Sequence, residues 1–519
     1  MSGDRSVRPT GEDGARRAGT PGPLGDPAAA ALVFGSSCAV LVVEIVALRL
    51  LAPYFGLTLE TSTLVIGLAL AAIAAGAWLG GRWADGHDAR GQLGRLLLVS
   101  GAVVAATPFL VRGAGTVPES GLLLPVTAAC IVVPGALLSA VTPMVTTLRL
   151  ASLAETGSVV GRLSGIGTAG AITGTVVTGF VLISRVPVTG IMVGLGVLLV
   201  AGGVVTEVAS RRAAAAVAAG AVAVLGGTGL AVLPSGCDVE TTYHCAVVQA
   251  DPEREGGLSL VLDNLRHSYV DTGDPEHLEF SYVRALAAAV DGTYPSGEAL
   301  DAHHLGGGGL TLPRWLAATR PGTTSTVSEI DPGVLAVDVE RLGLETGPDL
   351  RVEVEDARVG LRDVDDSSRD LVVGDAFGGV SVPWHLTTVE MLHDVRRVLR
   401  KDGTYAANLI DHPPLGFARA EVATLGTVFD HVALAATPAA VRGEGGGNLV
   451  VLASDAPIDT AAWQAGLDAR DVGWQVIEGS ALAAWVGDSP VLTDDYAPVD
   501  QLLTPYPSAR AASASPSRR

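Results

Sequence analysis

Residues 303–315 of this 519-residue chain read HHLGGGGLTLPRW, in which two histidines and a leucine precede four consecutive glycines and the start of a helical pattern. A glycine-rich turn between a strand and a helix leaves a ligand free to lie against the backbone. An ordinary flexible loop can also be rich in glycine. The segments on either side therefore decide how the run is interpreted.

Short apolar runs alternate with helical patterns from Ala299 onward, which is typical of a parallel sheet with crossover helices. The expected strands are 299–305, 323–328, 350–355 and 369–374. The expected helices between them include 310–318 and 331–343. This pattern predicts a Rossmann-like α/β domain.

Three acidic residues, Glu329, Asp356 and Asp375, fall at the carboxyl ends of these predicted strands. In an open parallel sheet, ligands bind beyond those ends, near the point where strand order reverses. An acid that accepts hydrogen bonds from ribose hydroxyls belongs about 20 residues after the glycines, and Glu329 meets that spacing. We therefore expect a nucleoside site at this edge.

Several ligand classes are disfavoured. A net charge of −20, without a basic tract in the acidic half, argues against nucleic acid. The glycines are not followed by the Gly-Lys-Ser/Thr phosphate cradle of nucleoside triphosphate sites, and they lack regular G-x-G-x-x-G spacing. The ligand class that remains is an S-adenosyl compound, which is nucleoside-like without being strongly anionic.

The first half of the chain has the composition of a membrane domain. Overall, 48% of residues are hydrophobic and 17% are charged, and residues 28–233 are nearly free of charge. Spanning a bilayer takes about 20 apolar helical residues. Seven segments qualify: 28–52, 61–81, 93–112, 121–145, 159–184, 188–208 and 213–233. Gly170 and Gly174 in the fifth give the small-xxx-small spacing of closely packed helices.

The expected domains follow from this division. Residues 1–27 form a disordered tail, 28–234 a transmembrane domain of about seven helices, 237–505 the α/β domain and 506–519 a second disordered tail.

The arginines predict an orientation in a cell membrane. They cluster before the first segment and in alternate links after it, which places the N-terminus in the cytoplasm and, with seven spans, the α/β domain outside. A cytoplasmic domain would require one segment not to span, and 213–233 is the weakest. Cys237 and Cys245 could form a disulfide if they face an oxidising compartment.

Glu44 lies within the first apolar segment. An ionisable group at membrane depth is a candidate functional residue. The alternative is a local partnership with Arg49 near the helix end.

The ordered motifs LVLDNLRHSYVDTGDPEHLEFSYVRAL, LGGGGLTLPR, VSEIDPGVL, EDAR and VVGDAFGGVSVPWHLTTVEM resemble the spermidine synthase family of aminopropyltransferases. The resemblance runs from Val239 to near Ser454, and the whole arrangement is similar to membrane-fused spermidine synthase-like proteins. It implies aminopropyl transfer from decarboxylated S-adenosylmethionine to putrescine or a related small amine, without a metal or a permanently bound cofactor.

Carried over by position, the resemblance implies a role for each candidate residue. Asp375 would be the catalytic carboxylate that takes the proton of the attacking amine, and Tyr282 would help to position that amine. The nucleoside would contact Gly306, Gly307, Gly308, Glu329 and Asp356.

The sequence also departs from the family pattern. Gly309 and Gly378 occupy places where acids that grip cationic amines are usual. The alternatives are therefore a membrane transport or binding protein with a catalytically altered domain, and an S-adenosylmethionine-dependent methyltransferase. The partners expected are a small amine and the lipid bilayer, with homo-oligomerisation left open.

The three histidines His267, His303 and His304 lack convergent metal-ligand spacing. We expect them to make local hydrogen bonds.

Overall fold

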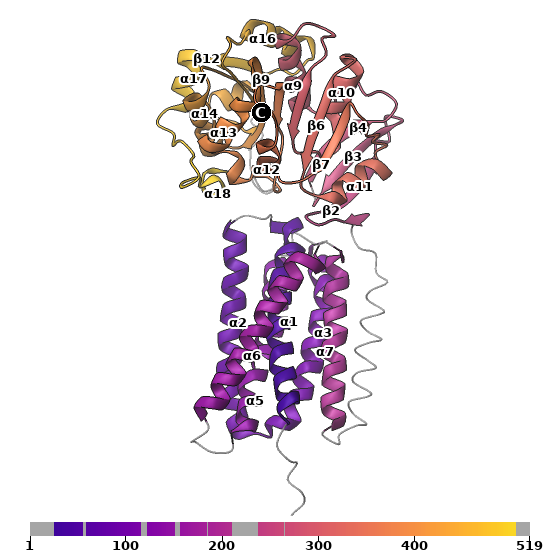
Figure 1. The fold of residues 1–519 in the computed structure, drawn as a ribbon, viewed down its shortest axis with the longest axis vertical. Helices are drawn as coiled ribbons and strands as arrows, with labels where there is room; N and C mark the ends of the chain where they lie inside the picture. Colours follow the sequence, from indigo (N-terminus) through magenta and orange to yellow (C-terminus); the bar gives the residue numbers. More distant parts are fainter. Residues whose placement is uncertain are drawn as a thin grey trace, which may run out of the picture.

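The computed structural model describes residues 25–55, 59–115, 122–150, 156–183, 185–209, 237–263 and 265–504. These form an N-terminal helical bundle and an α/β domain that lies at one end of it (Figure 1). Both expected tails lie outside the described residues, apart from the short stretch 25–27. The expected seventh segment, 213–233, also lies outside them.

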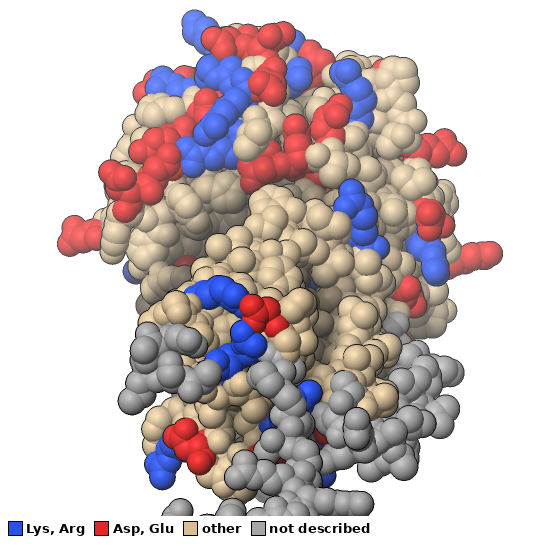
Figure 2. Space-filling view, turned by 60° about the horizontal axis from the view of Figure 1, so that its bottom comes forward, with Lys and Arg blue, Asp and Glu red and all other residues tan. Residues whose placement is uncertain are grey.

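The bundle has six helices, or helix pairs, that are long and apolar enough to cross a membrane in the described part of the chain. They agree with the first six expected segments. Their elements are α1 (Asp26–Phe55), α2 (Leu59–Gly86), α3 (Ala89–Gly115), α4 (Leu123–Ser139) with α5 (Val141–Arg149), α6 (Thr156–Val177) with the π-helix η3 (Thr178–Leu182), and α7 (Val188–Ala209). The flank of the bundle seen in Figure 2 is nearly free of charge until its lower end.

The predicted close packing of the fifth segment is confirmed. A Cβ atom at Gly170 would lie 2.3 Å from the Phe34 carbonyl oxygen, and one at Gly174 would lie 2.5 Å from that of Cys38. Only glycine allows α6 to approach the backbone of α1 so closely.

The α/β domain is built on an eight-stranded sheet in the order β12-β10-β11-β9-β8-β5-β6-β7. Its parallel part agrees with the expected strands: β5 (Asp301–Leu305), β6 (Thr324–Glu329), β7 (Leu350–Val354) and β8 (Arg369–Gly374), followed by β9 (Leu399–Asp411). The remaining strands pair antiparallel: β10 (His431–Ala436), β11 (Gly447–Ser454) and β12 (Gln475–Glu478).

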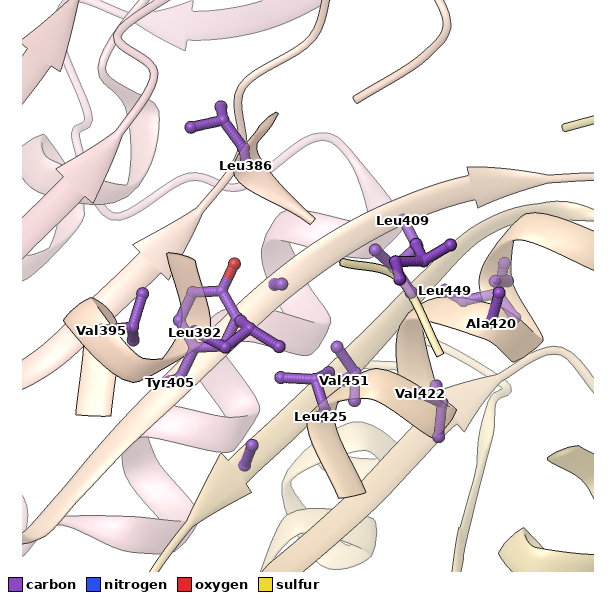
Figure 3. Close-up of a cluster of buried hydrophobic side chains, with 14 of the residues drawn as sticks. Leu386, Leu392, Val395, Tyr405, Leu409, Ala420, Val422, Leu425, Leu449 and Val451 are labelled. Carbon is purple, nitrogen blue, oxygen red and sulfur yellow. The ribbon is translucent and has the colours of Figure 1, made fainter. Parts of the chain in front are cut away.

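Helices cover both faces of this sheet, so its strands are buried on both sides. One face packs against α9 (Ser281–Thr293), α10 (Thr311–Thr319) and α16 (Thr460–Ala469). The other packs against α12 (Ala357–Arg362), α13 (Val389–Val398), α14 (Gly416–Val428) and α17 (Gly479–Val486). Figure 3 shows part of this second core, where Leu392 and Leu425 approach Tyr405 and Val451 of the sheet. The remaining helices are α11 (Pro332–Glu340), η4 (Trp384–Leu386), α15 (Pro438–Val441) and α18 (Val499–Leu502).

A four-stranded antiparallel sheet precedes the main sheet and was not predicted. It consists of β1 (Val239–Glu240), β2 (Cys245–Ala250), β3 (Gly257–Leu262) and β4 (Leu265–Asp271). A disulfide joins Cys237 and Cys245 at its start.

The first hairpin of this small sheet contacts the bundle. Arg49 of α1 donates a hydrogen bond to the Thr241 carbonyl oxygen. Arg112 of α3 pairs with Glu240, which also accepts a 3.1 Å hydrogen bond from the Thr189 hydroxyl of α7. Arg49 therefore faces the α/β domain, and no ion pair between it and Glu44 occurs among the described residues.

Candidate functional site

A cavity of about 470 Å³ opens at the carboxyl edge of the parallel strands. Strand β5 lies between β6 and β8, so the strand order reverses beside it. The cavity lies at this switch point, where the sequence placed the ligand. All seven candidate residues line it: Tyr282, Gly306, Gly307, Gly308, Glu329, Asp356 and Asp375.

The glycine loop connects β5 to α10 and passes close to neighbouring backbone. A Cβ atom at Gly306 would lie 2.5 Å from the Asp375 carbonyl oxygen. A larger residue at this position would therefore push the end of β5 away from the loop that follows β8.

Glu329, the last residue of β6, is buried at the floor of the glycine loop. Its Oε2 accepts a 2.8 Å hydrogen bond from the Gly307 N–H, and its Oε1 accepts one of 2.8 Å from the Asp331 N–H. Burial raises the pKa of Glu329, while these two N–H donors oppose that shift. The carboxylate is thus held in one orientation before any ligand arrives.

Asp356 follows β7 and caps α12. Its Oδ1 accepts hydrogen bonds from the Arg358 and Val359 N–H groups at 2.9 and 3.1 Å. Its Oδ2 lies 2.9 Å from Nε2 of His385, which follows β8 in the chain. Asp356 therefore joins the start of α12 to the short helix η4 at the cavity.

Asp375 follows β8, and it has a hydrogen-bond donor at each of its carboxylate oxygens. Its Oδ1 accepts a 2.9 Å hydrogen bond from the Asn408 amide, and its Oδ2 accepts one of 3.3 Å from the Tyr282 hydroxyl. Burial raises the pKa of Asp375 to about 6, against the lowering effect of these two hydrogen bonds. Such a carboxylate is ionised at neutral pH and is basic enough to accept a proton.

Two asparagines behind Asp375 were missed from the sequence. Asn408 lies in the buried strand β9, and its Oδ1 accepts a 2.9 Å hydrogen bond from the Asn448 amide of β11. Both line the cavity. The available signal was an amide inside an apolar run, because a buried polar side chain in a strand needs a partner.

A third missed residue is Asp338 of α11. It is fully buried and accepts a hydrogen bond from the Gly309 N–H at 3.1 Å. Burial raises its pKa well above the ordinary value for an aspartate. Asp338 thus anchors the far end of the glycine loop.

Gly309 and Gly378, which stand where the resemblance expects acidic residues, have different surroundings. Gly309 has a φ of +75°, and a Cβ atom there would lie 2.1 Å from the Ser268 hydroxyl oxygen. The backbone and Ser268 together exclude a side chain at this position. At Gly378, in contrast, a Cβ atom would meet no atom closer than 3.9 Å.

The expected hydrogen bonds of the three histidines are confirmed. The ring nitrogens of His267, His303 and His304 lie within 3.1 to 3.3 Å of the Leu265 carbonyl, the Ser328 hydroxyl and the Ser325 hydroxyl, respectively. Burial lowers the pKa of His303 to about 4 and that of His304 to about 3. Among the described residues, no group of three or more His, Cys, Asp or Glu side chains is placed to hold a metal ion.

The chain is 31% identical over 142 residues to a polyamine aminopropyltransferase of Vibrio vulnificus. Over that stretch this chain is similar to an aminopropyltransferase. The matched region covers 27% of this chain and 46% of the Vibrio protein, so the chain spans less than half the length of that relative. No family model matches the chain.

Solved structures similar to this chain include spermidine synthases and a methyltransferase. A probable spermidine synthase from Corynebacterium glutamicum is 28% identical, and the match covers 50% of this chain and 97% of that one, with a TM-score of 0.47. A spermidine synthase in complex with the transition state analogue AdoDATO is 16% identical over 44% of this chain and 74% of its own, with a TM-score of 0.34. Human methyltransferase-like protein 13, in complex with SAH, is 18% identical over 43% of this chain and 100% of its own, with a TM-score of 0.31.

Proposed function

We propose that this protein is an aminopropyltransferase that transfers the aminopropyl group of decarboxylated S-adenosylmethionine to an amine. The observation that carries the proposal is Asp375, a buried carboxylate of raised pKa that shares one cavity with Glu329 and the glycine loop. In this assignment Gly306, Gly307, Gly308, Glu329 and Asp356 hold the nucleoside. Tyr282 and Asp375 act on the amine.

The proposed reaction needs a neutral amine in line with the carbon–sulfur bond of the donor. The nitrogen lone pair forms the new carbon–nitrogen bond, and the electron pair of the breaking bond returns to sulfur, which leaves as a neutral thioether. Asp375 accepts the proton that the amine nitrogen loses. Because the sulfonium is already a good leaving group, holding the two reactants in line supplies most of the remaining acceleration.

The direct test is to incubate the purified full chain with decarboxylated S-adenosylmethionine labelled in its aminopropyl group and a panel of amines. Transfer of the label to an amine, with release of methylthioadenosine, is expected. Absence of transfer, despite binding of the donor, would contradict the proposal.

A second candidate, a binding or transport protein with an altered domain, is favoured by one observation. The family pattern has an acid at position 309, and Ser268 occupies the space that a side chain there would need. This candidate predicts nucleoside binding without turnover. The third candidate, a methyltransferase, is tested in the same assay with methyl-labelled S-adenosylmethionine.

We further propose that the bundle anchors the protein in a cell membrane with the α/β domain outside the cytoplasm. Arg149 and Arg162 pair with Asp26 at the start of α1, whereas the hairpin contacts of the α/β domain lie at the other end of that helix. The arginine-rich end is expected on the cytoplasmic side. The Cys237–Cys245 disulfide supports the external placement, because such bonds persist in oxidising compartments. This placement requires the donor on the same side as the domain.

A further inference from the structure

The cavity opens on the side of the α/β domain that faces the bundle. The carboxyl edge of the parallel strands, marked by α12 and the lower end of β7 in Figure 1, lies toward the bundle end. Two contacts fix this orientation. Asp331, just past β6, accepts a hydrogen bond from Thr241, which binds Arg49 of the bundle. Asp500 accepts a 2.9 Å hydrogen bond from the Leu59 N–H at the start of α2.

Large apolar side chains are exposed around this opening. We call Ile330, Val354, Val359 and Trp384 the apolar rim. Ile330 follows β6, Val354 ends β7, Val359 lies in α12, and Trp384 begins η4. Val359 is 55% exposed and Trp384 is 50% exposed.

Three members of the apolar rim lie at the cavity or beside a residue that lines it, and Val359 lies two residues after the lining residue Ala357. Ile330 itself lines the cavity, and Glu355, next to Val354, does so as well. Trp384 lies edge-on to the ring of His385, which binds Asp356. An exposed apolar patch around a binding site typically marks a surface that contacts a membrane or another apolar partner.

The direction of the rim selects the bilayer as the partner. Six apolar helices place the end of the bundle, and thus this edge of the domain, at the membrane surface if the proposed anchoring holds. Tryptophan favours the head-group layer, where its apolar ring contacts lipid while its N–H contacts water. Arg362 is exposed three residues after Val359 on α12, so the two share a helix face that suits lipid phosphates beside apolar chains.

The charges in the cavity favour an acceptor with a single amino group. Glu329 and Asp356 are assigned to the nucleoside, and Asp375, which accepts hydrogen bonds from Asn408 and Tyr282, is assigned to the amine. Gly309 and Gly378 stand where the resemblance expects acids that grip cationic amines, so a second ammonium group would lack the carboxylates expected at those two positions.

We infer that the apolar rim docks on the head-group layer and that the acceptor is a primary amine on a lipid head group, drawn from that leaflet. The inference rests on the proposed function, since it names the acceptor of the same reaction. The bond changes are those given above: the lipid nitrogen gains the aminopropyl carbon, the thioether leaves, and Asp375 takes the proton.

Docking is tested by the emission of Trp384 in bilayers that contain lipids brominated near the head group. The parent should lose more emission to these lipids than the Trp384→Phe variant does. Trp474→Phe, which removes a buried tryptophan of the α/β domain, should leave the lipid-dependent loss unchanged. Equal quenching in the parent and Trp384→Phe would overturn the docking.

The acceptor is tested in vesicles of phosphatidylethanolamine and phosphatidylcholine, with labelled donor, against a soluble amine panel. We expect labelled lipid from vesicles that contain phosphatidylethanolamine and no labelled lipid from vesicles of phosphatidylcholine. Label in soluble amines but not in lipid overturns this inference and leaves the proposed function intact. Label in neither, despite donor binding, contradicts the proposed function.

Val359→Asp provides the rim variant. Aspartate suits the first turn of a helix, so α12 should still form. Lipid-amine transfer should fall about tenfold or more, while donor affinity stays at the parent value. Ala461→Asp is the matched control: Ala461 is also exposed in the first turn of a helix with an aspartate cap, but α16 lies on the side of the domain away from the bundle (Figure 1). Equal losses in both variants would contradict the rim's role.

Discussion

At the scale of single residues, Asp375 has two properties that a proton acceptor needs. Its two hydrogen bonds, from Asn408 and Tyr282, fix the direction of the carboxylate. Its burial raises the pKa to about 6, so the group is ionised at neutral pH yet remains basic. The opposing effects of burial and hydrogen bonding set the pH range in which the site can work.

Asp375→Asn tests this assignment directly. The amide keeps the size of the side chain but cannot accept the amine proton, so turnover should fall by about a hundredfold or more while donor affinity changes little. Turnover is measured with labelled donor and affinity by calorimetry. Unchanged turnover would place the proton acceptor elsewhere.

The pH dependence of the reaction should follow the same group. In the proposed reaction Asp375 works as the ionised form, so kcat/KM should fall as pH drops through about 6. Asn408→Ala removes a hydrogen bond that lowers the pKa of Asp375, so the acid limb should move to higher pH. An acid limb that stays in place in the variant would show that Asn408 does not control this ionisation.

Glu329→Ala tests the nucleoside half of the site. Loss of its charge-assisted hydrogen bonds to ribose should weaken donor binding by on the order of 2 to 4 kcal/mol. Since Glu329 also holds the Gly307 N–H, thermal unfolding of the variant must be compared with the parent. Glu353→Ala, at an exposed position of β7, is the control. Equal affinity of parent and Glu329→Ala would remove Glu329 from the site.

At the scale of secondary-structure elements, the first hairpin links the bundle to the floor of the cavity. Thr241 binds Arg49 of α1 through its carbonyl and Asp331 through its hydroxyl. The Asp331 N–H in turn donates to Glu329. This chain of hydrogen bonds makes Thr241 a candidate positioning residue for the proposed nucleoside site.

Thr241→Val removes the hydroxyl while keeping the shape of the side chain. The hydroxyl donates to Asp331 and also accepts a 2.8 Å hydrogen bond from the His244 N–H. Each such hydrogen bond is worth about 1 kcal/mol, so donor affinity should fall about fivefold or more. Turnover at saturating donor should stay near the parent value, a split that general destabilisation would not produce. Thr293→Val, whose hydroxyl binds only a carbonyl within α9, is the control. Unchanged donor affinity in Thr241→Val would argue against the linkage.

At the scale of the whole molecule, the bundle and the α/β domain are joined through the hairpin that carries the disulfide. Arg112 and Thr189, from two helices of the bundle, both contact Glu240 beside that hairpin. In the proposed anchoring, the side of the membrane on which the hairpin lies decides the environment of the cavity and of Cys237 and Cys245.

Sidedness is tested by thiol labelling of intact cells with a membrane-impermeant reagent. The variant used replaces Cys38 and Cys130 with alanine and retains the Cys237–Cys245 pair. If the α/β domain is outside, labelling should appear only after mild reduction. Labelling that requires lysis but no reductant would place the domain in the cytoplasm, on the side where S-adenosyl donors are expected.

The sequence by itself determined the parallel part of the sheet and the position of its site. The segments expected at 299–305, 323–328, 350–355 and 369–374 became β5, β6, β7 and β8, because each is a short run rich in apolar or β-branched residues between turn residues. Parallel strands bring their carboxyl ends to one edge, so Glu329, Asp356 and Asp375 could be placed together from chain order alone.

Only the tertiary structure decided what surrounds those acids. Asn408 meets Asp375, Ser268 excludes a side chain at Gly309, and Arg49 reaches Thr241 across 192 positions of sequence. Local periodicity reports which side of an element is buried, but it carries no information on which distant side chain fills the facing space. The direction of the cavity mouth likewise depends on how the domain packs on the bundle. That packing depends on contacts between residues far apart in the sequence, such as those of Arg49 with Thr241 and of Leu59 with Asp500.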